Sequence, residues 1–115
     1  MRIARLIIVA TLAIWWPCVA RTYFADGNEL FSECSAKPGD PDYAAKSQLC
    51  LGYMVGVIDS REFELGAELC ASPKPTKEQI RNTVVQYLQK NPTQRALPAA
   101  MLTVNAVLQG FPCQR

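Results

Sequence analysis

The number and placement of the cysteines constrain the fold of this 115-residue chain more than any other feature. Cys18 lies within a predicted secretory signal, residues 1–20, in which two arginines precede an apolar stretch and small residues end at Ala20. Cleavage there starts the mature chain near Arg21 and leaves an even number of cysteines. In an exported domain an even number predicts two disulfides, here among Cys34, Cys50, Cys70 and Cys113.

The apolar stretch Leu6–Trp16 is too short to favour a retained membrane anchor. It has about half of the roughly 20 residues that a spanning helix needs, and Pro17 follows it directly. A lipid anchor on Cys18 is disfavoured too, because Trp and Pro precede that cysteine where small residues are required. We therefore expect no membrane segment after cleavage, and one domain over residues 21–115, a length that forms a single core.

The charge of the predicted mature domain excludes two classes of partner. Two of the 12 Lys and Arg residues, Arg2 and Arg5, lie in the signal, so ten remain against ten Asp and Glu. A neutral domain without a basic stripe lacks the clustered cations that replace counterions on nucleic acid. The same neutrality argues against binding to an anionic membrane surface.

Apolar periodicity predicts an all-α fold, a small four-helix domain of the up-down type stapled by two disulfides. The first predicted helix covers 28–34, with Asp26 or Asn28 as its N-cap. The second covers 42–69, and glycines at 52 and 56 within it imply close approach of another helix or of a partner, or alternatively a bend. Its expected inward stripe is Leu49, Tyr53, Gly56, Val57, Ser60 and Phe63.

The third and fourth helices have clearer boundaries. Thr76–Gln79 matches a capping box at the start of the third helix, and Asn91-Pro92 ends it, because a residue before proline is disfavoured in the helical region. Its expected buried stripe is Ile80, Val84, Tyr87 and Leu88. The fourth helix is expected to have Pro98 in its first turn and to end at Gly110 and Pro112. One of its faces is expected to be apolar: Leu97, Ala100, Met101, Val104, Leu108 and Phe111.

This layout predicts which cysteines pair. Cys50 and Cys70 lie near opposite ends of one predicted helix, about 30 Å apart at 1.5 Å per residue, whereas a disulfide needs Cα atoms within roughly 7 Å. Cys34 ends the first helix and faces Cys50 at the start of the second. If successive helices are antiparallel, Cys70 and Cys113 lie together at the same end of the domain. The predicted pairs are Cys34–Cys50 and Cys70–Cys113, each worth about 3 to 4 kcal/mol.

The sequence favours a binding protein over an enzyme. The chain has no histidine, which removes Ser-His and Cys-His nucleophile pairs and the commonest zinc ligand. The cysteines are assigned to disulfides, and neither a phosphate-binding glycine loop nor a calcium-loop spacing is present. We expect no metal and no cofactor. The second helix carries four acidic residues near its end, Asp59, Glu62, Glu64 and Glu68. Paired acids could serve as glycosidase carboxylates, but a solvated acidic helix face is the favoured interpretation.

Several short motifs in the same order carry a family resemblance. In chain order these motifs are Gly27–Leu30 before Cys34, the run Cys50–Asp59, Cys70, Thr76–Gln79, Tyr87-Leu88 before Asn91-Pro92, and the terminal Phe111–Cys113. This series resembles the Tai/Rap family of type VI secretion system immunity proteins. The resemblance implies a periplasmic protein that neutralises a secreted peptidoglycan amidase, often as a homodimer.

Two segments are candidates for partner contact. The polar turn Lys90–Arg95, stiffened by Pro92, has the features of a loop that reaches into a cleft, and an ordinary helix connection is the alternative; its candidate effector-binding residues are Lys90, Asn91, Thr93, Gln94 and Arg95. Because Arg95 is treated as a contact residue, its replacement by Glu is expected to weaken binding without changing stability. A second surface, Gly52, Tyr53 and Gly56, belongs either to a self-association face or to the core.

A different class of function also fits the composition. Half of the chain is hydrophobic, and the ten carboxylates of the mature domain lose charge in acid, which suits a periplasmic acid-stress chaperone that opens at low pH. Two disulfides would restrain such opening. A general envelope protein without a toxin partner is the third alternative.

Overall fold

The computed structural model describes residues 23–65 and 74–112, and these residues form four α-helices. They are α1 (Gly27–Cys34), α2 (Tyr43–Leu65), α3 (Lys77–Lys90) and α4 (Ala99–Gly110), with a short 3-10 turn, η1 (Pro92–Gln94), between α3 and α4. The described ranges contain no strand, only one isolated bridge between Asp26 and Pro98. The predicted all-α, four-helix fold is confirmed. The predicted end of the second helix, at Leu69, lies outside the described residues.

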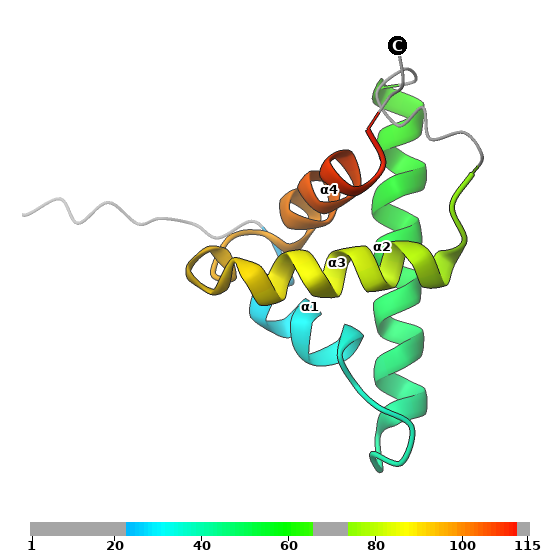
Figure 1. Ribbon diagram of the computed structural model, residues 1–115, viewed down its shortest axis with the longest axis vertical. Coiled ribbons are helices and arrows are strands. Elements are labelled where there is room, and N and C mark those ends of the chain that lie inside the picture. Colours follow the sequence, from blue (N-terminus) through cyan, green and yellow to red (C-terminus); the bar gives the residue numbers. More distant parts are fainter. Residues whose placement is uncertain (1–22, 66–73, 113–115) are drawn as a thin grey trace, which may run out of the picture.

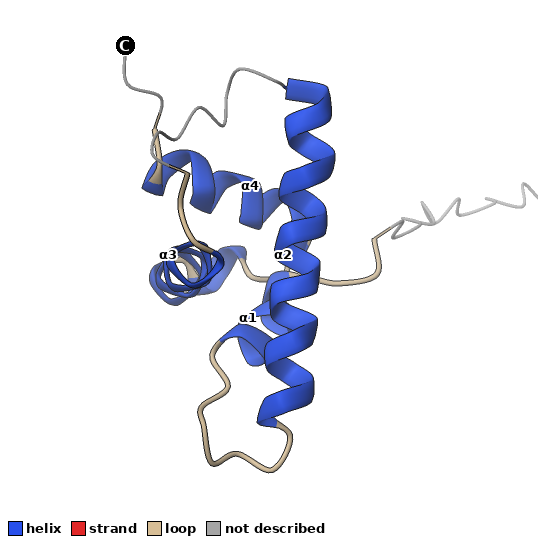
Figure 2. Cartoon of the chain, turned by 90° about the vertical axis from the view of Figure 1, so that its right-hand side faces the viewer, coloured by secondary structure: helices blue, strands red, loops and turns tan. Residues whose placement is uncertain are grey.

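The longest helix, α2, carries the other three on one side. α3 runs across α2 and not along it: Figure 1 shows the two helices crossing, and Figure 2 shows α3 nearly end-on beside the upright α2. Each of the four α-helices contacts the other three, so the core lies where they meet around the middle of α2. None of the helices in the described part of the chain has the length and apolar character needed to cross a bilayer.

Local sequence signals set the helix starts. The carboxylate of Asp26 accepts from the amide of Glu29 at 3.0 Å, so Asp26 is the N-cap of α1. At the start of α3 the capping box is complete: the amide of Gln79 donates to the Thr76 hydroxyl, and the side-chain oxygen of Gln79 accepts from the Thr76 amide. α3 ends at Lys90, directly before Asn91-Pro92, as predicted.

The predicted inward faces of two helices are only partly correct: Tyr53 and Phe111 pack against the core, but the most buried residues lie elsewhere. On α2 the core residues are Cys50 and Met54, whereas Leu49 is 58% exposed and Gly56 and Ser60 are exposed. On α4 the buried residues are Ala99, Leu102, Thr103, Ala106 and Val107, while Leu97 and Met101 are 41% and 39% exposed. Both helices carry apolar residues over more than one face, so periodicity alone selected the wrong stripe.

The stripe predicted for α3 is confirmed at three of its four positions. Ile80, Val84 and Leu88 are buried, and Tyr87 is half-buried at the edge of the core. The buried hydroxyl of Thr103 on α4 donates to the carbonyl of Ala99 at 2.8 Å. No buried side-chain N or O atom in the described ranges lacks a hydrogen-bond partner, as expected of a well-packed core.

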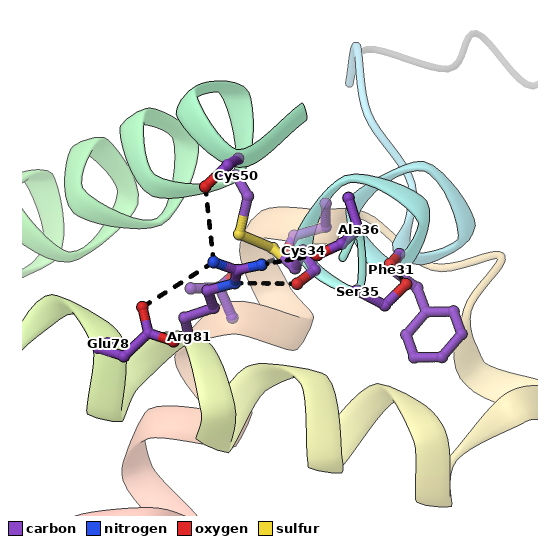
Figure 3. Close-up of a disulfide and its surroundings, with 10 residues drawn as sticks. Phe31, Cys34, Ser35, Ala36, Cys50, Glu78 and Arg81 are labelled. Atoms are coloured by element: carbon purple, nitrogen blue, oxygen red, sulfur yellow. Dashed lines mark hydrogen bonds and ion pairs between the residues drawn. A yellow bond between two sulfur atoms is a disulfide. The ribbon is translucent and has the colours of Figure 1, made fainter. Parts of the chain in front are cut away.

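One predicted disulfide is present. Cys34 at the end of α1 and Cys50 on α2 are bonded, with their Cα atoms 5.0 Å apart, and both are buried (Figure 3). The bond fixes α1 against α2. The second predicted pair, Cys70 with Cys113, lies outside the described residues.

Candidate functional site

The connection between α3 and α4 is the candidate site, and we call residues 90–98 the α3–α4 loop. Its first half is a helical turn: Pro92 opens η1, and the amide of Gln94 donates to the carbonyl of Asn91 at 3.1 Å. A further turn follows, in which the amide of Leu97 donates to the carbonyl of Gln94 at 2.9 Å. Proline at the first position of η1 fixes the backbone dihedral angle φ. No hydrogen bond is lost, because an amide hydrogen at that position would have no acceptor within the turn. The loop is therefore an ordered structure of its own.

Side chains at the base of the loop turn back onto α3. The amide nitrogen Nδ2 of Asn91 donates to the carbonyl of Tyr87 at 2.8 Å. The same carbonyl also accepts from the backbone amide of Asn91 at 3.1 Å, so Asn91 closes the end of α3 with both its backbone and its side chain. The hydroxyl of Tyr87 in turn donates to Oε1 of Gln94 at 3.2 Å. Asn91 is thus occupied within the chain, whereas Gln94 remains exposed.

Arg95 is integrated into the fold. Its Nε donates to the carbonyl of Leu88 at 2.7 Å, and its guanidinium lies 4.0 Å from the centre of the Phe31 ring on α1. A cation over an aromatic face and a charged donor at a helix C-terminus both stabilise the folded state. These contacts argue against the expectation that Arg95→Glu leaves stability untouched, and we now expect this change to destabilise the fold.

The exposed part of the loop is its tip, which we define as Lys90 and Pro92–Gln94. The side chains of Lys90, Pro92, Thr93 and Gln94 are exposed, whereas Asn91 and Arg95 are half-buried. Beside the tip, a shallow depression of about 170 Å³ runs between α3 and α4, lined by Thr83, Gln86, Tyr87, Lys90, Asn91, Ala106, Gln109 and Gly110. The five residues predicted from sequence are brought together, and Pro92 joins the surface that they form.

The second predicted surface lies on α2. A Cβ added at Gly52 or at Gly56 would meet no atom within 4 Å, so the prediction that another helix of this chain packs closely on these glycines is wrong. Tyr53 beside them is half-buried where α2 meets α4. Burial raises the pKa of the Tyr53 hydroxyl, the carboxylates of Glu29 and Glu33 act in the same direction, and a hydrogen bond with the backbone of Ala100 opposes them.

Exposed apolar side chains from α2, from α4 and from the end of the α3–α4 loop flank this contact. Leu49 lies one turn before Tyr53 on α2, and Leu97 and Met101 lie on either side of Ala100 in the sequence. We call the combined surface, Leu49, Gly52, Tyr53, Gly56, Leu97 and Met101, the α2–α4 face. It contains some of the residues that the sequence predicted to face inward, and among its members only Tyr53 is partly covered by the described part of the chain.

The acidic residues named from the sequence lie only partly within the described ranges. The described residues contain no group of three or more Cys, Asp or Glu side chains arranged to hold a metal ion. Asp59 and Glu62 are exposed on α2, and the side chain of Glu64 and all of Glu68 lie outside what the structure describes. A groove of about 450 Å³ between α3 and the α1–α2 connection has mixed polar and apolar walls that include Phe31, Tyr43 and Arg81.

The contacts that organise the loop were missed at the sequence level. Phe31 and Gly27 are more than 60 residues from Arg95, and no local pattern links them. The tip and the turn residues could be found because proline and polar residues between two helical patterns mark a connection.

Comparison with known proteins agrees with the architecture. No curated protein and no solved structure matches the chain. The family model described as Rap1a immunity proteins matches residues 26–113, which spans all four helices and the α3–α4 loop. Immunity proteins protect the cell that makes them by binding a secreted effector. This chain belongs to the Rap1a immunity protein family.

Proposed function

We propose that this protein is exported to the periplasm and blocks a peptidoglycan amidase delivered by a type VI secretion system. The proposal rests on family membership, on the predicted signal at residues 1–20, and on an ordered polar loop whose tip is exposed. The ordered tip is the observation that carries the mechanism. Inhibition by occlusion needs no chemistry from the inhibitor, only a segment that fills the substrate groove and excludes the stem peptide.

The tip suits this role because its shape is set before binding. Pro92 and three backbone hydrogen bonds define the turn, and the side chains of Asn91 and Arg95 hold it against α3. A rigid segment loses less conformational entropy on binding than a mobile one. An interface of standard size, about 800 Å² per partner, is larger than the tip alone, so the neighbouring depression between α3 and α4 forms the rest of the contact.

The test is inhibition of a candidate secreted amidase from the same genome, measured as release of peptides from peptidoglycan. The native chain should inhibit stoichiometrically. The double variant Lys90→Glu, Thr93→Glu should lose affinity about 30-fold or more, as expected for hot-spot residues. Lys77→Glu reverses an exposed charge at the other end of α3 and is the matched control. Equal inhibition by all three would exclude the tip.

Location is tested in living cells. Growth of bacteria that direct the amidase to their periplasm should be rescued by the protein with residues 1–20, and not by the protein that lacks them. Lysis that continues in the presence of folded, exported protein would reject either the chosen amidase or the immunity role.

We also propose that a second copy of the chain covers the α2–α4 face. The exposed Leu49, Leu97 and Met101 supply apolar area, and glycines with open space above them let a partner backbone approach. Because a Cβ at Gly56 meets nothing within 4 Å, Gly56→Arg leaves the monomer fold intact. Sedimentation should show a dimer for the native chain and a monomer for Gly56→Arg. Asn82→Arg, at an exposed site on α3, should remain dimeric.

A further inference from the structure

We propose that the segment Tyr23–Asn28, together with Arg95, positions the α3–α4 loop, and that these residues act on partner binding through the loop without touching the partner. We call the segment Tyr23–Asn28 the splint. The effect on binding rests on the proposed function, whereas the effect on loop order is a property of the free protein.

The splint pairs with the second half of the loop along its backbone. The amide of Asn28 donates to the carbonyl of Arg95 at 3.0 Å, and the amide of Gly27 donates to the carbonyl of Leu97 at 3.1 Å. In the opposite direction, the amide of Ala99 donates to the carbonyl of Ala25 at 3.0 Å. Asp26 and Pro98 form an antiparallel bridge between these bonds. Figure 1 shows this blue start of the described chain beside the orange connection that leads into α4.

Gly27 is the point of closest approach. A Cβ on this buried glycine would lie 2.8 Å from the Cα and the carbonyl oxygen of Arg95, and 2.4 Å from Cδ1 of Leu102. Any larger residue must therefore displace the backbone of the loop, because the atoms it meets include main-chain atoms that cannot rotate away. Glycine at this position permits the pairing of the splint with the loop.

The side chain of Arg95 ties the same stretch to two further elements. Its hydrogen bond to the carbonyl of Leu88 reaches the last turn of α3, and its contact with Phe31 reaches α1. α1 is held to α2 by the buried disulfide between Cys34 and Cys50. The base of the loop is thus fixed to α1 and α3 and, through the disulfide, to α2, while the tip is left exposed.

Loss of these ties should lower the fraction of molecules with a binding-competent tip. Apparent affinity falls in proportion to that fraction. A variant of a positioning residue that leaves the tip in its binding conformation in about one molecule in ten therefore binds about tenfold more weakly. The tip residues themselves are unchanged in such a variant. This separates the positioning residues from the contact residues.

The deciding experiment is amide hydrogen exchange on the free protein, followed at Gln94, Arg95 and Leu97. Gly27→Ala and Arg95→Ala should each speed exchange at these amides at least about tenfold while the buried core of α2 and α3 keeps its protection. Arg95→Lys, which keeps the cation over Phe31, should restore part of the protection. Tyr23→Phe removes only the hydrogen bond from the Tyr23 hydroxyl to the carbonyl of Ala96. It is the mildest of these changes and keeps the test possible if Gly27→Ala does not fold.

Unchanged loop exchange in folded Arg95→Ala and Tyr23→Phe would overturn the proposal, as would faster exchange spread evenly over the whole chain. The binding arm uses the candidate amidase with the same variants. If the native chain does not bind that amidase, the proposed function fails for it while the exchange data still decide whether the splint positions the loop. If the native chain binds and loop exchange rises without loss of affinity, the positioning role in binding is rejected.

Discussion

The guanidinium of Arg81 on α3 donates from Nε to the carbonyl oxygen of Cys34 at 3.0 Å (Figure 3). Cys34 is the last residue of α1 and forms the disulfide with Cys50, so this hydrogen bond joins α3 to the disulfide-bonded end of α1. A second nitrogen of the same side chain donates to the carbonyl of Ala36 at 3.1 Å. The side chain is only 11% exposed, and Glu78 lies 3.9 Å away as its carboxylate partner. Carbonyls at the end of a helix lack intrahelical partners, and Arg81 supplies a donor to the carbonyl of the last residue of α1 and to one carbonyl just beyond it.

Removal of Arg81 should therefore destabilise the fold. Arg81→Ala leaves the carbonyls of Cys34 and Ala36 without this donor in a partly buried site, at a cost of about 1–3 kcal/mol. Arg81→Lys keeps the charge but loses the planar fork, so it should recover only part of the loss. Denaturant unfolding measures both. A free energy of unfolding for Arg81→Ala equal to that of the native chain would show that the contact contributes nothing.

Both disulfides can be checked by non-reducing peptide mapping of the exported protein. We expect Cys34 linked to Cys50, as the structure shows, and Cys70 linked to Cys113, which stays a prediction. Glu62 of α2 and Phe111 after α4 line one small pocket together with Lys74 and Pro75. Recovery of free thiols at Cys70 and Cys113 would contradict the second pair.

Replacement of Gly52 by alanine should raise stability. The position is exposed in the middle of α2, a Cβ there meets nothing within 4 Å, and alanine favours a helix over glycine by up to about 1 kcal/mol. Gly27→Ala is the opposite control and should cost about 1–3 kcal/mol through overpacking against Arg95. Thermal unfolding at low protein concentration compares the two. A lower melting temperature for Gly52→Ala would mean that the α2–α4 face is covered within the single chain.

Glu33 gives a prediction about pH. Burial raises the pKa of its carboxyl above the ordinary 4.5, Glu29 adds to the increase, and Lys46 opposes it. A carboxyl with a raised pKa in the folded state favours folding when protonated, so its contribution is present below pH 4.5 and is lost as the pH rises through the folded-state pKa. Glu33→Gln should therefore raise the melting temperature slightly at pH 7 and leave it unchanged at pH 3.5. A lower melting temperature at pH 7 would show that Lys46 outweighs burial.

Local signals were sufficient for helix boundaries. The capping box at Thr76–Gln79 and the stop at Asn91-Pro92 depend on neighbouring residues only, and both are confirmed. Of the two residues predicted as the cap of the first helix, Asp26 and Asn28, the structure selects Asp26. The pairing of Cys34 with Cys50 followed from the short connection between the first two helices. These features need no knowledge of how the helices pack.

The inward faces of α2 and α4 could not be predicted for a physical reason. Apolar residues surround much of both helices, so several stripes have helical spacing, and the contacts between helices decide which one is buried. The same applies to the loop: Arg95 was predicted as a partner contact because it lies in a polar turn, and only the fold reveals Phe31 beneath it and Gly27 against its backbone.

The most direct test of the account is calorimetric titration of the candidate secreted amidase with the native protein, with the tip variant Lys90→Glu, Thr93→Glu, and with the control Lys77→Glu. The account predicts tight binding by the native chain and by Lys77→Glu, and a loss of about 30-fold or more for the tip variant at unchanged melting temperature. Equal affinity of all three proteins for the amidase would contradict the central claim that the tip of the α3–α4 loop fills the enzyme's groove.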